Sequence, residues 1–272
     1  MKKFLTHTIG FIAIPAIILF SIYFNTFLKI DNQVNDIAVD NSTLLLGDSQ
    51  TQRINPDYFN HSTFNFASPG EPYLVTYYKL IKVLSFNNHN IKTVILGCSM
   101  HNFASAYEES YDMKSSAGSQ TLKKSMYYVD ILNDSILSFK DFISDRMFYL
   151  GIWKGQRTNG LFESTNKNPS VETIKKTLNG HYKSTSKFNS TEFFEQEFYL
   201  KKIIELCKIK KVKLYLLTLP LHQYYKDNIP PICVENYKSI INQFELNHIN
   251  YLSDDINNEY MSDGNHLNSD GA

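Results

Sequence analysis

The chain has 272 residues, of which 43% are hydrophobic, and its 27 basic and 27 acidic side chains cancel. This length and composition suffice for one sizeable core with at most a subsidiary lobe. The balanced charge, with only Arg53, Arg146 and Arg157 as arginines, excludes the basic footprint of a nucleic-acid-binding protein and any strong pull to anionic lipid.

The first thirty residues are predicted to form an uncleaved membrane anchor. No residue between Lys3 and Lys29 carries a formal charge, and residues 9–24 are nearly all apolar, which approaches the ~20 residues that cross a bilayer. A cleaved signal peptide is the competing interpretation, although no Ala-x-Ala-like site follows the apolar run. A buried core helix is a third, disfavoured because the run has no polar face.

The paired lysines at the start of the chain indicate the topology. Lys2 and Lys3 favour a cytoplasmic N-terminus, so everything from about Asp31 onward is expected outside the cytoplasm. The sequence thus predicts a single-pass protein of a bacterial inner (cytoplasmic) membrane, whose domain faces the periplasm or the exterior. We divide it into an anchor at 1–30, a polar linker at 31–42 and one domain at 43–272.

The first strand of this domain is predicted at 43–47, an apolar run that stops at Gly47 and is followed by Asp48 and Ser49. Such a run is typical of a buried strand in a parallel sheet. Open α/β sheets place their active sites at the carboxyl ends of the strands. Ser49 is therefore a candidate nucleophile, provided that a base reaches it from elsewhere in the chain.

Two further strands end in small or polar residues at the same expected edge. A strand at 63–67 leads into Ser68-Pro69-Gly70-Glu71-Pro72 and then a helix with apolar residues at helical spacing. A strand at 91–97 is followed by Cys98-Ser99-Met100-His101-Asn102. Residues 104–187 are predicted to be an insertion or lid, with helices at 122–137 and 139–150.

Regular alternation returns in the last third of the chain. We predict a helix at 191–208, a strand at 212–219, a helix at 233–246 and a short strand at 249–252. The alternation of strands with helices favours a three-layer α/β/α sandwich with a parallel sheet. The three cysteines, Cys98, Cys207 and Cys233, are expected to be buried thiols, with a bridge between the last two left open. No His/Cys cluster has zinc spacing, and neither metal nor cofactor is expected.

The candidate base lies far downstream, in Asp263-Gly264-Asn265-His266. A serine hydroxyl is a poor nucleophile unless an imidazole takes its proton, and the imidazole works best when a carboxylate fixes its tautomer. His266 and Asp263, three residues apart in a turn, can supply that pair for Ser49. Taken singly, each of these residues is an ordinary turn or surface residue; their order and their places at strand ends favour the catalytic interpretation.

These blocks resemble those of the SGNH hydrolases, also called the GDSL family, which includes lipases, esterases and carbohydrate acyl esterases. Gly47-Asp48-Ser49 corresponds to the nucleophile block, and Asp263-Gly264-Asn265-His266 to the Asp-x-x-His block. The segment from Asn65 to Glu71 is similar to the block whose glycine, here Gly70, lends a backbone N–H to the oxyanion hole. The resemblance implies a Ser49, His266, Asp263 triad and spans residues 43–272.

The fourth block departs from the family pattern. The family has Gly-x-Asn-Asp after the third strand, with the asparagine as an oxyanion donor, whereas here Gly97-Cys98 is followed by Ser99. We expect the oxyanion hole to comprise Ser49, Gly70 and Ser99, with His101 and Asn102 as alternative donors and Asp48 as a further site residue. Loss of one donor typically costs ~3 kcal/mol of transition-state stabilisation.

An anchor joined to such a domain resembles membrane-tethered proteins of bacterial polysaccharide acetylation. This resemblance implies an esterase or O-acyltransferase that acts on acyl groups, in particular acetyl groups, of cell-envelope glycans or of another small ester. A membrane acyl-donor protein is a further expected partner. The alternative is a catalytically impaired relative that binds glycan or a partner protein. The chain ends at Asp270-Gly271-Ala272, where a closing helix is expected, so the sequence is also expected to be a fragment.

Overall fold

The computed structural model describes residues 1–272 except 1, 112–127, 129–163, 183–193, 245 and 255. The helices predicted at 122–137 and 139–150 lie almost wholly outside the described residues. Within the described part, strands alternate with helices along the chain, so the predicted α/β class is confirmed.

Five parallel strands form one sheet in the order β2-β1-β3-β4-β5. The strands are β1 (Thr43–Leu46), β2 (Thr63–Asn65), β3 (Thr93–Gly97), β4 (Lys213–Thr218) and β5 (Asn247–Asn250). Thr43 pairs with Thr63 on one side and Thr93 on the other, so the carboxyl ends of the three strands meet at one edge. Leu44, Leu45 and Leu46 are fully buried, as expected for a central parallel strand covered on both faces.

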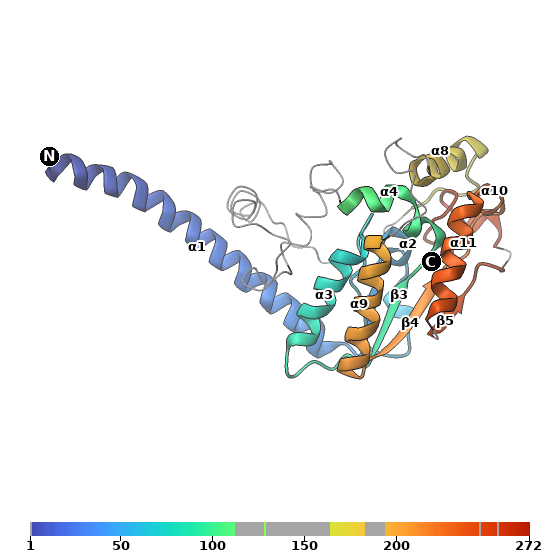
Figure 1. The fold of residues 1–272 in the computed structure, drawn as a ribbon, viewed down its shortest axis with the longest axis horizontal. Coiled ribbons are helices and arrows are strands. Elements are labelled where there is room, and N and C mark those ends of the chain that lie inside the picture. Colours follow the sequence, from blue (N-terminus) through green and yellow to red (C-terminus); the bar gives the residue numbers. More distant parts are fainter. Residues whose placement is uncertain (1, 112–127, 129–163, 183–193, 245, 255) are drawn as a thin grey trace.

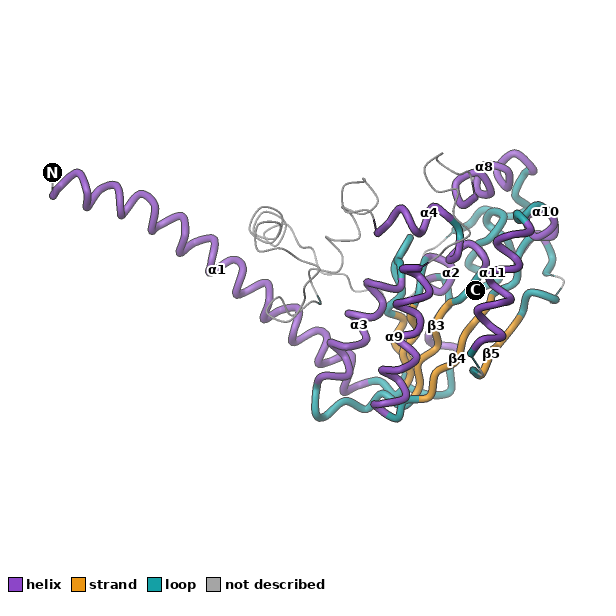
Figure 2. The backbone as a smooth tube through the Cα atoms, viewed as in Figure 1, coloured by secondary structure: helices purple, strands orange, loops and turns teal. Residues whose placement is uncertain are grey.

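Three helices cover one face of the sheet, as Figures 1 and 2 show for α3 (Tyr73–Ser85), α9 (Phe194–Lys210) and α11 (Pro231–Gln243). Their buried side chains join alternate residues of the strands, including Leu44 and Val94, in the main core. All three helices were predicted, with small shifts at their ends.

The opposite face carries a smaller apolar cluster, in which Leu45, Ile95 and Leu217 pack against Ile54 and Phe59. These last two residues flank the short elements α2 (Ser49–Gln52) and η1 (Pro56–Tyr58), which follow β1. Beside the cluster lies an apolar cavity of about 330 Å³ against β3, β4 and β5. Among the described residues, the second helical layer of the predicted sandwich is thus limited to short elements.

The long helix α1 (Lys2–Asp40) differs from the expected division into anchor and linker. Residues 31–42, predicted as a polar linker, are helical up to Asp40, and the helix extends away from the domain in Figure 1. The physical reason is an apolar stripe at four-residue spacing: Ile30, Val34 and Ala38 are buried in the main core. Of the described helical segments, none meets the length and apolarity that a membrane crossing requires.

The remaining short elements gather near the carboxyl edge of the sheet. They are α4 (Ser105–Glu108), α8 (Val171–Tyr182), α10 (Gln223–Asp227), η2 (Met100–Phe103), η3 (Glu109–Tyr111) and η5 (Asn258–Tyr260). α8 lies next to α10 in Figure 2 and was not predicted.

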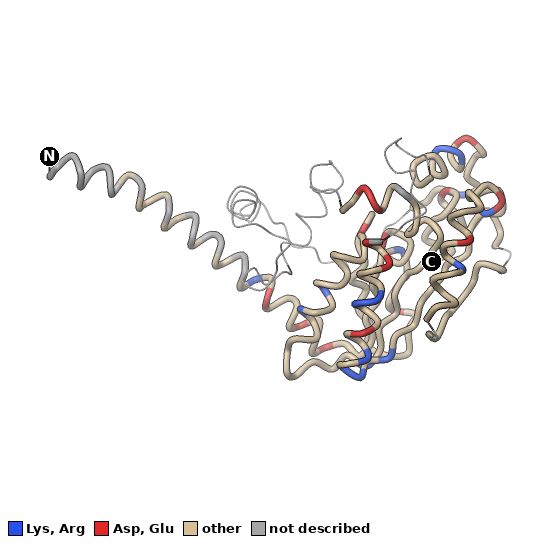
Figure 3. The backbone as a smooth tube through the Cα atoms, in the orientation of Figure 1, with Lys and Arg blue, Asp and Glu red and all other residues tan. Residues whose placement is uncertain are grey.

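Acidic and basic residues both occur throughout the domain (Figure 3). Cys98, Cys207 and Cys233 are buried free thiols, as the sequence predicted.

Candidate active site

Ser49 begins the short helix α2 immediately after β1, at the edge where β1, β2 and β3 end. Asp48 caps this helix by accepting a hydrogen bond from the Gln50 amide at 3.0 Å. The tight exit from β1 depends on two glycines. A Cβ on Gly97 would lie 2.0 Å from Oγ1 of Thr51, and Gly47 has a φ of +132° that favours glycine.

The three predicted triad residues lie in hydrogen-bond contact. Oγ of Ser49 is 2.7 Å from Nε2 of His266, although the residues are 217 positions apart. Nδ1 of His266 is 2.9 Å from Oδ2 of Asp263. Oδ1 of Asp263 accepts the backbone N–H groups of Asn265 and His266, both at 2.9 Å. This is the chain of contacts that transfers a proton from a serine hydroxyl to an imidazole.

The protonation of this pair suits a base that faces Ser49. Burial alone would raise the pKa of Asp263, but its hydrogen bond and charge interaction with His266 and two backbone N–H groups outweigh that effect, so the pKa is lowered. Asp263 is therefore a carboxylate that accepts the Nδ1 proton of His266. The Nε2 lone pair is then directed at the hydroxyl of Ser49.

Helix α2 also holds the loop that carries His266. Nε2 of Gln50 donates to the carbonyl of Asn265 at 2.8 Å, and Nη1 of Arg53 donates to the carbonyl of Leu267 at 3.0 Å. Ser49 and the loop of His266 are thus held together by the side chains one and four residues after Ser49. Sequence reasoning missed both, because their acceptors are backbone carbonyls, which leave no mark in a sequence.

Asn65, at the end of β2, fixes the other end of α2. Its amide donates to the carbonyls of Thr51 at 2.8 Å and Ile54 at 2.9 Å, and its oxygen accepts the amide of Ala67 at 3.1 Å. The residue is fully buried. The side chain of Asn65 therefore connects helix α2 to the start of the segment that carries Gly70.

A buried ion pair between Lys79 and Glu71 holds the segment that carries Gly70. Nζ of Lys79 lies 2.5 Å from Oε2 of Glu71, and both side chains are essentially inaccessible to solvent. Lys79 also donates to the carbonyl of Phe66 at 2.7 Å and to Oγ of Ser68 at 2.8 Å. The ammonium group thus joins three points of the segment that precedes and follows Gly70, which has a φ of +56°.

The predicted oxyanion donors differ in what they already bind. No described residue accepts a hydrogen bond from the backbone N–H of Ser49 or of Gly70. The backbone N–H of Ser99 donates to Oδ1 of Asn102 at 2.7 Å, and Oγ of Ser99 is buried without a partner. Backbone N–H groups free to donate are what an oxyanion hole requires.

Asp48, His101 and Asn102 form a network beside the triad. Oδ2 of Asp48 lies 2.6 Å from Nε2 of His101 and accepts from Nδ2 of Asn102 and the hydroxyl of Tyr107, both at 2.9 Å. Burial would raise the pKa of Asp48, but His101, Tyr107 and the Gln50 amide outweigh it, so the pKa lies well below its ordinary value. The Asn102 amide is thus engaged with Asp48.

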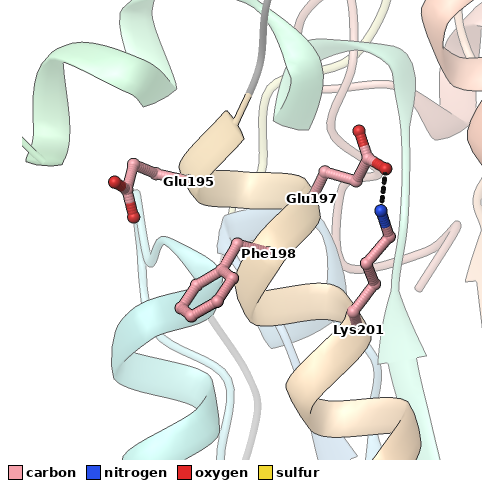
Figure 4. A pocket seen from close by; sticks show the side chains of 4 residues that line it. All are labelled: Glu195, Glu197, Phe198 and Lys201. Atoms are coloured by element: carbon pink, nitrogen blue, oxygen red, sulfur yellow. Dashed lines mark ion pairs between the residues drawn. The ribbon is translucent and has the colours of Figure 1, made fainter.

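A cavity of about 380 Å³ lies elsewhere, on the surface of α9. Figure 4 shows Glu195 and Phe198 on one side of it and the ion pair between Glu197 and Lys201 on the other. None of its lining residues belongs to the triad. Within the described part of the chain, no group of three or more His, Cys, Asp or Glu side chains is placed to hold a metal ion.

Comparisons with known proteins find distant likenesses to solved structures. No protein-family model and no curated protein matches the chain. One solved structure, "a putative platelet activating factor from Streptococcus pneumonia", is 12% identical, with 96% of this chain and 92% of that chain covered and a TM-score of 0.40. Another, "a putative acylhydrolase" from Bacteroides fragilis NCTC 9343, is 14% identical, with 84% and 79% covered and a TM-score of 0.38.

Proposed function

We propose that the chain is a serine esterase or O-acyltransferase that works through Ser49, His266 and Asp263. The observation that carries this proposal is the contact of 2.7 Å between Oγ of Ser49 and Nε2 of His266, continued at 2.9 Å to Asp263. Such an arrangement lets an imidazole take the serine proton as the hydroxyl attacks a carbonyl carbon.

In the proposed reaction, Oγ of Ser49 bonds to the ester carbonyl carbon and its proton passes to Nε2 of His266. The tetrahedral intermediate then loses the alcohol, whose oxygen takes the proton from His266, and the acyl group stays on Ser49. A second hydroxyl compound gives its proton to His266 and attacks the acyl carbon. The bond between that carbon and Oγ of Ser49 then breaks, and Oγ takes the proton back from His266, which restores the free enzyme. Water as this acceptor gives hydrolysis, and a sugar hydroxyl gives transfer.

The proposed substrates are acyl groups, in particular acetyl groups, of cell-envelope glycans, with a membrane acyl-donor protein as a partner in the transfer case. This part rests on the sequence: a charge-free apolar segment precedes the domain, and the blocks resemble the SGNH family. The test is turnover of a small acetyl ester and of an acetylated oligosaccharide by the purified protein. Binding of the oligosaccharide without turnover of either substrate would instead favour the non-catalytic glycan-binding alternative.

We propose that residues 43–272 lie outside the cytoplasmic membrane, with the N-terminus inside. The support is the pair Lys2 and Lys3 before the apolar segment, because positive residues stay on the cytoplasmic side. Protease added to intact spheroplasts should digest the domain while a cytoplasmic marker protein survives. A domain that is digested only after the spheroplasts are lysed would contradict this topology.

A further inference from the structure

Helix α8 packs against the loop that carries the catalytic pair. Its buried residues Ile174 and Leu178 are followed at the same helical face by His181. A Cβ on Gly264 would lie 2.9 Å from Cγ2 of Ile174 and 2.5 Å from Cδ2 of Tyr225. α8 and α10, which carries Tyr225, therefore lie directly on the turn between Asp263 and His266.

The same helix reaches the third block of the site through His181. The imidazole of His181 stacks on that of His101, with the ring centroids 4.9 Å apart and the planes 21° from parallel. His101 in turn contacts Asp48, the neighbour of Ser49. Helix α8 thus contacts the His266 loop through Ile174 and the segment after β3 through His181.

The state of the His181 ring follows from its surroundings. Burial lowers the pKa of His181 to about 3, with further lowering by His101 and His266, so the ring is neutral at physiological pH. Nδ1 of His181 is 2.6 Å from the hydroxyl of Tyr225. Burial raises the pKa of Tyr225 well above its ordinary value, so that phenol keeps its proton. The protonated hydroxyl of Tyr225 can donate to Nδ1, and in that arrangement the ring proton of His181 is on Nε2.

The Nε2 atom of His181 is available for a ligand. It makes no hydrogen bond with any described residue. The His181 ring is held by the stack with His101 and by the hydroxyl of Tyr225. A neutral imidazole N–H held in this way is a preorganised donor of the kind that stabilises an oxyanion.

Resting on the proposed function, we propose that His181 is a catalytic residue whose Nε2–H donates to the oxyanion formed at Ser49, with Tyr225 as the positioning residue that fixes its tautomer. His181 takes the part that an asparagine has in the SGNH family, because the amide of Asn102 is engaged with Asp48. The donor comes from α8 rather than from the segment after β3.

Two substitutions at one position separate donation from packing. His181→Phe keeps a stacking ring but has no donor, whereas His181→Gln keeps an N–H near the position of Nε2 but has no ring. We expect kcat for an acetyl ester to fall by roughly 100-fold in His181→Phe, with KM nearly unchanged, because one oxyanion donor is lost. His181→Gln should recover part of this loss, and Tyr225→Phe should show a smaller fall in kcat. His61→Phe, at an exposed loop before β2, is the matched control and should match the wild type.

A spectroscopic readout tests the tautomer without turnover. In NMR spectra of protein with ¹⁵N-labelled histidine, the ring signals of His181 are those present in the wild type and missing from His181→Phe. These signals should show a neutral ring protonated at Nε2. Three results would overturn the role of His181 while leaving the proposed function intact. They are a ring protonated at Nδ1, equal losses of kcat in His181→Phe and His181→Gln, and a kcat in His181→Phe close to that of an active wild type. Absence of turnover and of any fluorophosphonate adduct in the wild type would overturn the proposed function and this inference with it.

Discussion

Ser49→Ala is expected to reduce the turnover of an acetyl ester by roughly 10⁴-fold to 10⁶-fold, because the nucleophile of a triad is lost. His266→Ala should cause a similar loss, since without the imidazole the hydroxyl keeps its proton. Asp263→Asn should cost somewhat less than removal of the base, because the base remains while its tautomer and orientation are spoiled. The measurement is kcat/KM for each purified variant.

The double variant Ser49→Ala/His266→Ala provides the sharpest control on this result. Triad members act as a unit, so the double variant should be no slower than Ser49→Ala alone. Ser85→Ala, an exposed serine at the end of α3, should keep full activity. Independent, multiplicative losses from Ser49 and His266, or turnover that survives in Ser49→Ala, would show that they do not form one catalytic unit.

Lys79→Met is expected to destabilise the fold by about 3–5 kcal/mol, because it leaves the carboxylate of Glu71 buried without its partner. Both side chains are almost completely inaccessible, so solvent cannot compensate the charge. A loss of this size is a large part of the ~5–15 kcal/mol that stabilises a typical domain. Denaturant unfolding of the purified variant measures it.

Two further variants show whether burial of the unpaired charge is the cause. Lys79→Met combined with Glu71→Gln removes both charges and should recover much of the lost stability. Lys82→Met makes the same change one turn further along α3, where Lys82 pairs with Asp31 at a partly exposed site, and should cost less than ~1 kcal/mol. Equal losses in Lys79→Met and Lys82→Met would contradict the assignment.

The central strand of the sheet could be predicted from the sequence because it is a continuous apolar run that ends at a glycine. The strand places buried leucines, Leu44, Leu45 and Leu46, on both faces of the sheet, and the glycine that follows them marks the turn. The edge strand β5 was predicted two residues too late. It is Asn247–Asn250, and an edge strand with polar residues such as His248, which contacts Thr218, has no continuous apolar run.

Two helices were missed or misread for a common reason. The end of α1 and the whole of α8 carry their apolar residues one turn apart among polar neighbours, as with Ile174 and Leu178. Only the four-residue spacing distinguishes such a helix from a linker or a polar insertion. His181 continues the spacing in α8, and this is the signal by which it could have been found.

Of the candidate site, the sequence predicted the residues that belong to short motifs. Ser49, Asp263 and His266 are each recognisable within three or four neighbours, and they lie in contact in the structure. Gln50 and Arg53 could not be found in this way, since they bind backbone carbonyls more than 200 positions away. Their role depends on the folded position of the loop, which no local pattern encodes.

The most direct test of the central claim is intact-mass analysis of the full-length protein after reaction with a fluorophosphonate. A serine activated by a neighbouring imidazole attacks the phosphorus and expels fluoride, whereas an ordinary serine does not react. We predict one adduct per chain, located at Ser49 by peptide mapping and absent from both Ser49→Ala and His266→Ala. A folded wild-type protein that forms no adduct, or forms it equally well in Ser49→Ala, would contradict the account.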